Sequence, residues 1–161
     1  MSSVFYRIDD RLIHGQVITG WSRFYQLKRI IILDDSVAND PVQQQIISLV
    51  APSDINVYIE SIEDGAQAIQ KSERDGASTL VLVKGPHALL ELVNKNVSVD
   101  KVVVGGMQFK SGRNKITNTV SATEEEASTF KVLSGKGVDI VYQVIPTDKE
   151  QDFIHLLKVN S

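Results

Sequence analysis

The chain has 161 residues, enough for one domain with a sizeable core, and its 42% apolar and 23% charged residues are an ordinary globular balance. A net charge of −3 without a long basic block argues against a nucleic-acid-binding protein. The absence of cysteine excludes disulfides, iron–sulfur clusters and thiol catalysis.

The first part of the chain alternates strand-like and helix-like segments. A strand is expected at Val4–Ile8, followed by an amphipathic helix from about Gly15, where apolar residues recur at helical spacing. A second strand is expected at Arg29–Leu33. Asp40-Pro41 then places an N-cap acceptor and a first-turn proline ahead of a helix, and the next strand is expected at Asn56–Ile59.

The same alternation continues in the middle of the chain. Ser61, with an acidic residue three positions later, resembles a loose capping box at a helix start. Strands are expected at Thr79–Val83 and Lys101–Val104, and Gly85-Pro86 opens a helix between them.

The last part of the chain repeats the pattern with a weaker strand. That strand is expected near Ile116–Val120, and a stronger one at Asp139–Val144. Thr123 and Thr147 each precede a glutamate by three positions, so both are predicted to begin helices through capping boxes.

The strongest strand segments, "RIIIL", "TLVLV" and "KVVVG", are continuously apolar instead of alternating. Strands buried on both faces have this pattern, which favours a parallel sheet covered by helices. No repeat, linker or low-complexity segment interrupts the chain. We therefore predict one α/β domain over residues 1–161: a single open, mostly parallel twisted sheet of about seven strands with helices on both faces.

The start of the chain lacks the apolar core of a signal peptide, and no apolar run is long enough to cross a bilayer. The sequence therefore predicts a cytoplasmic protein. Neither a zinc-ligand spacing nor a glycine-rich nucleotide fingerprint occurs, so no metal or other cofactor is expected.

Charged and glycine-rich segments follow several of the expected strands. They are Asp9–His14, Asp34–Ser36, Lys84 and Gly105–Lys115. In an open parallel sheet the carboxyl ends of the strands share one edge, and ligands bind there. We expect these segments to meet at that edge.

His14 is the candidate reactive residue, because it lies where a helix begins, and helix N-termini attract phosphate. Arg11 and Arg7 can supply guanidinium groups to a phosphoryl group, and Asp9 or Asp10 can orient either the imidazole or an arginine. Gly15 leaves room for a partner beside the ring. Together, these residues suit a histidine that accepts a phosphoryl group and then donates it.

Two other interpretations of these residues stay open. The charges around His14 can be a solvated ion-pair cluster of little energetic weight, in a binding or regulatory module without turnover. Alternatively, Asp9-Asp10 and Lys84 resemble the acidic site and lysine of a receiver-like domain phosphorylated on aspartate, although the third strand then offers Glu60 where an aspartate is expected.

The motif "RIDDRLIHGQV" with a following tryptophan closely resembles the IIB component of the mannose/fructose/sorbose family of the bacterial phosphoenolpyruvate-dependent sugar phosphotransferase system. The resemblance covers nearly the whole chain in order, through "DDSVANDPVQQQIISLVAP", "LVLVKGPHALLELV", "VVVGGMQFKSGRNKITNTVSATEEE" and "GVDIVYQVIPTD". The chain begins at the IIB domain, so the resemblance is to the stand-alone form.

The resemblance implies a phosphoryl carrier of the same open α/β fold. Its His14 would take a phosphoryl group from IIA on Nδ1, the pros nitrogen, and pass it to a sugar of the mannose, fructose, sorbose or N-acetylated hexosamine class. That sugar would arrive through the membrane components IIC and IID, with which a cytoplasmic IIB associates peripherally. The candidate phosphoryl-binding residues are Arg7, Asp9, Asp10, Arg11, Gly15 and Gln16, and the candidate partner-facing residues are Lys84, Lys110, Arg113 and Lys115.

Overall fold

The computed structural model describes residues 3–160, and its main element is a seven-stranded sheet with the order β3-β2-β4-β1-β5-β8-β9. All neighbouring strands are parallel except β9, which runs antiparallel to β8. The strands of this sheet are β1 Val4–Asp9, β2 Arg29–Leu33, β3 Asn56–Glu60, β4 Thr79–Val83, β5 Lys101–Gly106, β8 Asp139–Tyr142 and β9 Gln151–Asp152. The predicted fold class is confirmed.

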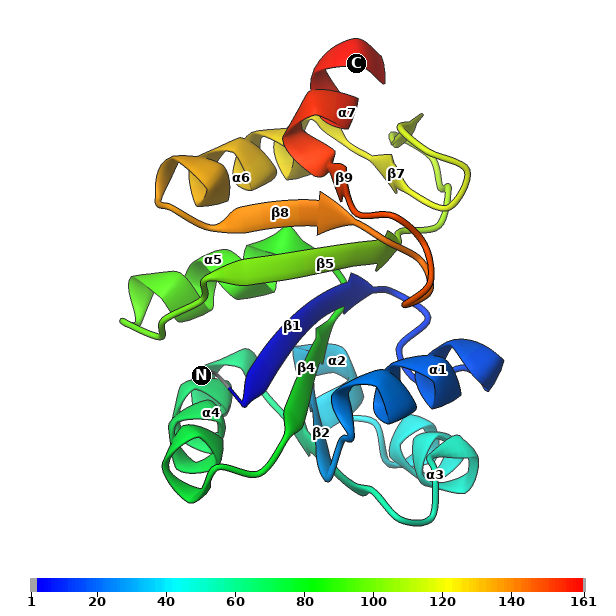
Figure 1. Ribbon diagram of the computed structural model, residues 1–161, viewed down its shortest axis with the longest axis vertical. Helices are drawn as coiled ribbons and strands as arrows, with labels where there is room; N and C mark the ends of the chain where they lie inside the picture. The colour runs from blue at the N-terminus through cyan, green and yellow to red at the C-terminus, as the bar shows by residue number, and fades with distance from the viewer. Residues whose placement is uncertain (1–2, 161) are drawn as a thin grey trace.

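Helices cover both faces of the sheet (Figure 1). The helices are α1 Gly15–Tyr25, α2 Asp35–Ala38, α3 Pro41–Val50, α4 Ile62–Asp75, α5 Pro86–Asn94, α6 Glu124–Gly135 and α7 Phe153–Asn160. One core cluster joins the strands to α1, α2 and α3, and another joins them to α4, α5, α6 and α7. Within the described residues, none of these helices is both long and apolar enough to cross a membrane.

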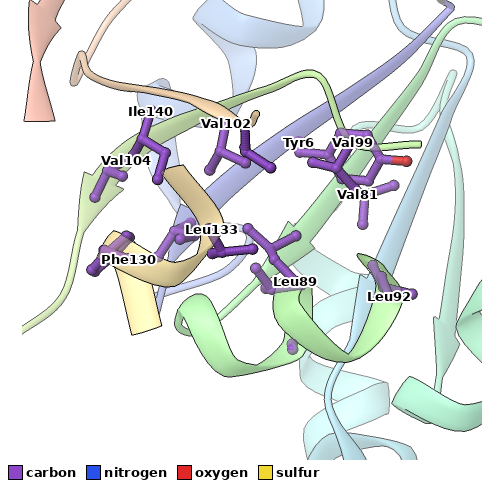
Figure 2. Close-up of a cluster of buried hydrophobic side chains, with 14 of the residues drawn as sticks. Tyr6, Val81, Leu89, Leu92, Val99, Val102, Val104, Phe130, Leu133 and Ile140 are labelled. Atoms are coloured by element: carbon purple, nitrogen blue, oxygen red, sulfur yellow. The ribbon is translucent and has the colours of Figure 1, made fainter. Parts of the chain in front are cut away.

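The larger core cluster fixes the strands relative to α5 and α6 (Figure 2). Leu89 of α5 and Phe130 of α6 are fully buried against strand residues such as Val102 and Val104. Burying a side chain of this size is worth about 1.5–3 kcal/mol. The carboxyl edge of the sheet is therefore a rigid base for the loops that follow each strand.

The segment expected to be a weak strand, Ile116–Val120, is instead a turn. It joins two short antiparallel strands, β6 Asn114–Lys115 and β7 Ser121–Ala122. The Thr117 hydroxyl accepts hydrogen bonds from the backbone N–H groups of Thr119 and Val120, which bends the chain. The apolar residues there are buried because they anchor a turn. In the sequence, they resemble the apolar residues of a strand.

The predicted helix starts are correct at Asp40, Ser61 and Thr123, whose side chains accept hydrogen bonds from first-turn N–H groups. The capping box predicted at Thr147 is wrong. Its glutamate, Glu150, pairs instead with Lys101 at 2.8 Å, and α7 begins later, at Phe153.

Strand β8 ends at Tyr142, two residues before the predicted end. The carbonyl groups of Gln143 and Val144 accept hydrogen bonds from side chains instead of from a strand, as described below.

Candidate functional site

The turn between β1 and α1, residues 10–14, lies at the carboxyl edge of the sheet and carries the candidate reactive residue. Strand β1 is flanked by β4 and β5. Lys84 directly follows β4, and Gly105-Gly106 ends β5. Figure 1 shows the connection after β8 passing beside the end of β1. The structure therefore brings the predicted segments to one edge.

Apolar side chains anchor the turn immediately before His14. Leu12 and Ile13 are buried in the core cluster that includes α1. Leu12 has φ +58°, a left-handed conformation that is unusual for a residue other than glycine, and its N–H donates to the Asp9 carbonyl at 2.9 Å. Burial of Leu12 offsets the backbone strain and fixes where the turn delivers His14.

His14 is the N-cap residue of α1 and is partly buried. Its Nδ1 lies 3.1 Å from the Leu12 carbonyl oxygen, which can only accept, so Nδ1 carries a hydrogen in this conformation. Its Nε2 is buried and has no hydrogen-bond partner in the described structure. Neither nitrogen is therefore free to react without a turn of the ring.

The N-terminus of α1 is open to an anion. The His14 side chain makes no capping hydrogen bond, and the first turn of the helix contains no acidic residue. The first N–H groups of a helix have no partner within the helix, and the helix dipole favours negative charge at this end. Gly15 has φ +47°, and a Cβ there would meet no atom within 4 Å. The side chain of Gln16, another candidate, lies outside the described part of the structure.

Asp9 and Arg11, which precede His14 by five and three residues, form a bidentate pair. Arg11 Nε and Nη2 donate to the two carboxylate oxygens of Asp9, each at 3.0 Å. Asp9 is 1% exposed, whereas the Arg11 side chain is 32% exposed. The hydrogen bond to Asp9 raises the pKa of Arg11, so Arg11 stays charged with part of its surface open to a phosphoryl group.

Arg7 does not have the role predicted for it. It is 2% exposed and donates to the backbone carbonyls of Gln143 and Val144, both at 2.9 Å. Its guanidinium also lies over the Trp21 ring, 4.8 Å from the centroid. Burial lowers the pKa of Arg7 to about 10, despite the neighbouring Asp9 carboxylate. Arg7 is therefore a structural cation, out of reach of a phosphoryl group.

The two glycines that end β5 make room for these arginines. A Cβ on Gly105 would overlap the Arg7 guanidinium, and a Cβ on Gly106 would lie 2.9 Å from Arg11 Nη2. The pair Gly105-Gly106 therefore lets both arginines lie against the backbone of β5.

Asp10 belongs to a second network, which fixes the loop after β5. Its Oδ2 accepts from the Gln108 N–H at 2.8 Å and from Arg113 Nη1 at 3.2 Å. Arg113 also donates to the Gln108 carbonyl and forms a bidentate pair with Glu126 of α6. The two adjacent aspartates thus have separate functions: Asp9 orients Arg11, and Asp10 holds the loop.

The expectation that Arg113 faces a partner is wrong, because only 6% of it is exposed. Burial acts to lower the pKa of Arg113, but the hydrogen bonds to Glu126 and Asp10 outweigh it and raise that pKa. Glu126, which the sequence analysis did not select as a site residue, could have been noticed only as the glutamate of a capping box.

Among the other candidates for partner contact, Lys84 lies 3.5 Å from Asp34 in an ion pair. Lys110 and Lys115 are exposed, and neither forms an ion pair in the part of the chain that the structure describes. Two of the four predicted partner-facing residues, Lys110 and Lys115, are therefore exposed and outside the ion pairs of the described residues.

The receiver-like interpretation does not fit this geometry. A phosphoaspartate site needs a free acidic cluster for magnesium, and both Asp9 and Asp10 are paired with arginines. Over residues 3–160, no three acidic or histidine side chains gather in a way that could hold a metal ion.

Comparison with known proteins gives a consistent result. A family model described as "PTS system sorbose subfamily IIB component" matches residues 3–161. The fructose-specific EIIB component of Bacillus subtilis (strain 168) is 35% identical over 158 residues, which are 98% of this chain and 97% of that protein.

Two further comparisons agree. The mannose-specific EIIAB component of Escherichia coli (strain K12) is 32% identical over 94% of this chain, but the match spans only 47% of that longer protein. The crystal structure of the IIBSor domain of the sorbose permease from Klebsiella pneumoniae superposes with a TM-score of 0.93 at 30% identity, covering 100% of this chain and 99% of that one.

Proposed function

The chain belongs to the sorbose subfamily of IIB components of the sugar phosphotransferase system, proteins of phosphoryl transfer in sugar uptake, and from this we propose that His14 is its phosphoryl carrier. The proposal rests most directly on one observation: His14 is the N-cap of a helix whose N-terminus has no side-chain cap, and the arginine three residues before it is held by a buried carboxylate. Together these groups can bind the charge of a phosphoryl group on the ring.

The reaction has two transfers. First, the nitrogen–phosphorus bond of a phosphohistidine on IIA breaks while a new one forms to His14, and the donor imidazole takes the His14 proton. Second, a sugar hydroxyl oxygen attacks the phosphorus, the bond to His14 breaks, and the hydroxyl proton replaces the phosphoryl group on the imidazole. Catalysis of such steps is mainly positioning and charge neutralisation, which Arg11 and the α1 N-terminus supply.

The proposed acceptor atom is Nδ1, which is held in a hydrogen bond in the unphosphorylated conformation. Nδ1 donates to the Leu12 carbonyl, so the ring must turn away from Leu12 before Nδ1 can attack. Because Gly15 has no Cβ and the space around it is open, a turned ring has room beside the helix start.

The proposed partners follow from the family. IIA would be the donor, and the membrane components IIC and IID would hold the sugar, which belongs to the mannose, fructose, sorbose or N-acetylated hexosamine class. The protein would act in the cytoplasm, bound peripherally to that membrane complex.

The test is labelling from phosphoenolpyruvate in the presence of the general phosphotransferase proteins and IIA. His14→Ala should remove all label, and His87→Ala, which changes an exposed histidine, should leave it unchanged. The label should be lost in acid and kept in base, as for phosphohistidine and opposite to a phosphoaspartate. Full labelling of His14→Ala would refute the proposal, and no labelling of the wild type would favour a module without turnover.

A further inference from the structure

A cavity of about 630 Å³ opens beside Arg11, between the loop after β5 and the β6–β7 turn. Its volume is within the range of about 300–1,000 Å³ found for sites that hold small molecules. The residues that line it include Arg11, Gln108, Phe109, Lys115, Asn118 and Thr119.

The lining has the charge and hydrogen-bonding groups expected for an anionic, hydroxylated ligand. Two of its residues, Arg11 and Lys115, are cations and none is acidic. In the described structure Arg11 uses only Nε and Nη2 in hydrogen bonds, so Nη1 is available. Gln108 and Asn118 have exposed side-chain amides, which can both donate and accept.

Hydrogen bonds hold the walls of this cavity in place. The backbone of Gln108 is fixed on both sides, because its N–H donates to Asp10 at 2.8 Å and its carbonyl accepts from Arg113 at 2.7 Å. The Thr119 hydroxyl donates to the Gly105 carbonyl and is paired with the Tyr142 hydroxyl, both at 2.7 Å. Such a site needs little ordering when a ligand binds.

Phe109 adds an exposed aromatic ring to this lining. It is 73% exposed, although it lies in a loop whose backbone is fixed. Binding sites for small molecules commonly combine an aromatic side chain with a few oriented polar groups, and a sugar ring presents both a C–H face and hydroxyl edges. The lining therefore suits a sugar ester better than a bare inorganic anion.

We propose that this cavity is a binding site for the sugar phosphate that leaves the transfer reaction. Arg11 and Lys115 would hold the phosphate, Gln108 and Asn118 the hydroxyls, and Phe109 the C–H face of the ring. This inference rests on the proposed function, since Arg11 would first stabilise the phosphoryl group on His14 and then remain in contact with it on the sugar. The IIB component would then contribute part of the acceptor site.

The test is to titrate the isolated, unphosphorylated protein with mannose 6-phosphate and to monitor the titration by the NMR signals of the backbone amides. Saturable shifts are expected at Gln108, Lys115 and Asn118. Mannose and inorganic phosphate should each bind at least about tenfold more weakly, because each lacks half of the contacts. Lys115→Ala and Asn118→Ala should weaken binding about five- to tenfold, as expected for loss of one hydrogen-bonding group. Lys28→Ala, at the opposite edge of the sheet, should not.

The proposal would be overturned by the absence of a saturable shift, by shifts confined to residues outside the cavity, or by equal affinity for inorganic phosphate. It would also fail if Lys115→Ala and Asn118→Ala slowed only transfer from IIA, because the cavity would then contact the donor protein. The titration needs no phosphorylated histidine. If the protein binds mannose 6-phosphate but His14 is not labelled, the proposed phosphoryl carrier is refuted and the cavity site is not. If His14 is labelled but mannose 6-phosphate does not bind, the cavity site is refuted and the carrier is not.

Discussion

Asp9 and Arg11 are joined by two parallel hydrogen bonds of 3.0 Å, with the carboxylate buried and the guanidinium partly exposed. A bidentate pair fixes the plane of the guanidinium as well as its position. Asp9 should therefore contribute to phosphoryl transfer by orienting Arg11.

The first prediction is that Asp9→Asn and Arg11→Ala are not additive. Arg11→Ala should slow transfer from IIA by about 10²–10⁴-fold, and Arg11→Lys should recover only part of the rate, because an ammonium lacks the planar fork. The double variant should be little slower than Arg11→Ala alone, because the two residues act as a unit. Rapid-quench kinetics on the wild type and all four variants measure this. If the rate losses of Asp9→Asn and Arg11→Ala multiply in the double variant, Asp9 has a separate role.

The second prediction concerns the space that Gly105 leaves for Arg7. Gly105→Ala should lower the free energy of unfolding by about 1–3 kcal/mol, because the new methyl group displaces a buried guanidinium with fixed partners. Gly135→Ala is the control, since a Cβ there meets no atom within 4 Å. Urea denaturation of both variants checks it, and equal stability of the two would show that Arg7 can move freely.

The third prediction is a pH dependence of stability at Glu126. Burial acts to raise the pKa of Glu126, but its hydrogen bonds with Arg113 and Thr123 outweigh burial and lower that pKa below the ordinary 4.5. The unfolded chain therefore takes up a proton first as the pH falls. The stabilisation from ionised Glu126 is full above about pH 4.5 and is lost as the pH falls through the lower folded value.

Glu126→Gln should accordingly lower the free energy of unfolding by about 1–3 kcal/mol near neutral pH, and by progressively less below pH 4.5. Glu125→Gln removes a charge from the same helical turn at an exposed position and should change stability much less. Denaturation curves from pH 3 to pH 7 measure both, and a Glu126→Gln deficit that persists unchanged at low pH would contradict the assignment.

The fourth prediction concerns the tautomer of His14. In the unphosphorylated protein, ¹⁵N-detected imidazole spectra should show hydrogen on Nδ1 and a lone pair on Nε2, because Nδ1 donates to the Leu12 carbonyl. After phosphorylation the phosphorus should be coupled to Nδ1. Phosphorus on Nε2 would contradict the proposed acceptor atom.

The fifth prediction concerns encounter with IIA. Neutralising the two exposed lysines, Lys110→Ala with Lys115→Ala, should slow transfer from IIA by about two- to fivefold at low salt and by less at high salt, because exposed charges act mainly on association. Lys136→Ala, at the end of α6, is the control. Indifference of the wild-type rate to ionic strength would remove any role for the lysines in steering.

Much of the fold was predictable because its causes are local. The β2 and β4 segments are apolar at nearly every position and are buried on both faces, so their composition already implies a parallel sheet. Asp40 and Thr123 cap the helices that directly follow them. The failure at Thr147 is equally informative, because Glu150 is taken by Lys101, a residue 49 positions away.

The candidate site was predictable in position but not in roles. The motif placed His14 at a helix start, and the structure has it there. The roles of Arg7 and Arg113 depend on partners up to 137 residues away in sequence, and nothing in "YRIDD" or "KSGRNK" distinguishes a buried arginine from an exposed one. Long-range pairing of charges is the part that a local pattern cannot supply.

The hydrogen bonds from Arg7 to Gln143 and Val144 also bear on how the protein is made. They join the first strand to carbonyls 136 and 137 residues later, so Arg7 cannot reach these partners until β8 and the two residues after it have been synthesised. A nascent chain that has emerged only as far as β5 carries His14 but leaves Arg7 without these partners. The carboxyl end of β1 should therefore reach its final packing late in synthesis, once β8 has been added beside β5.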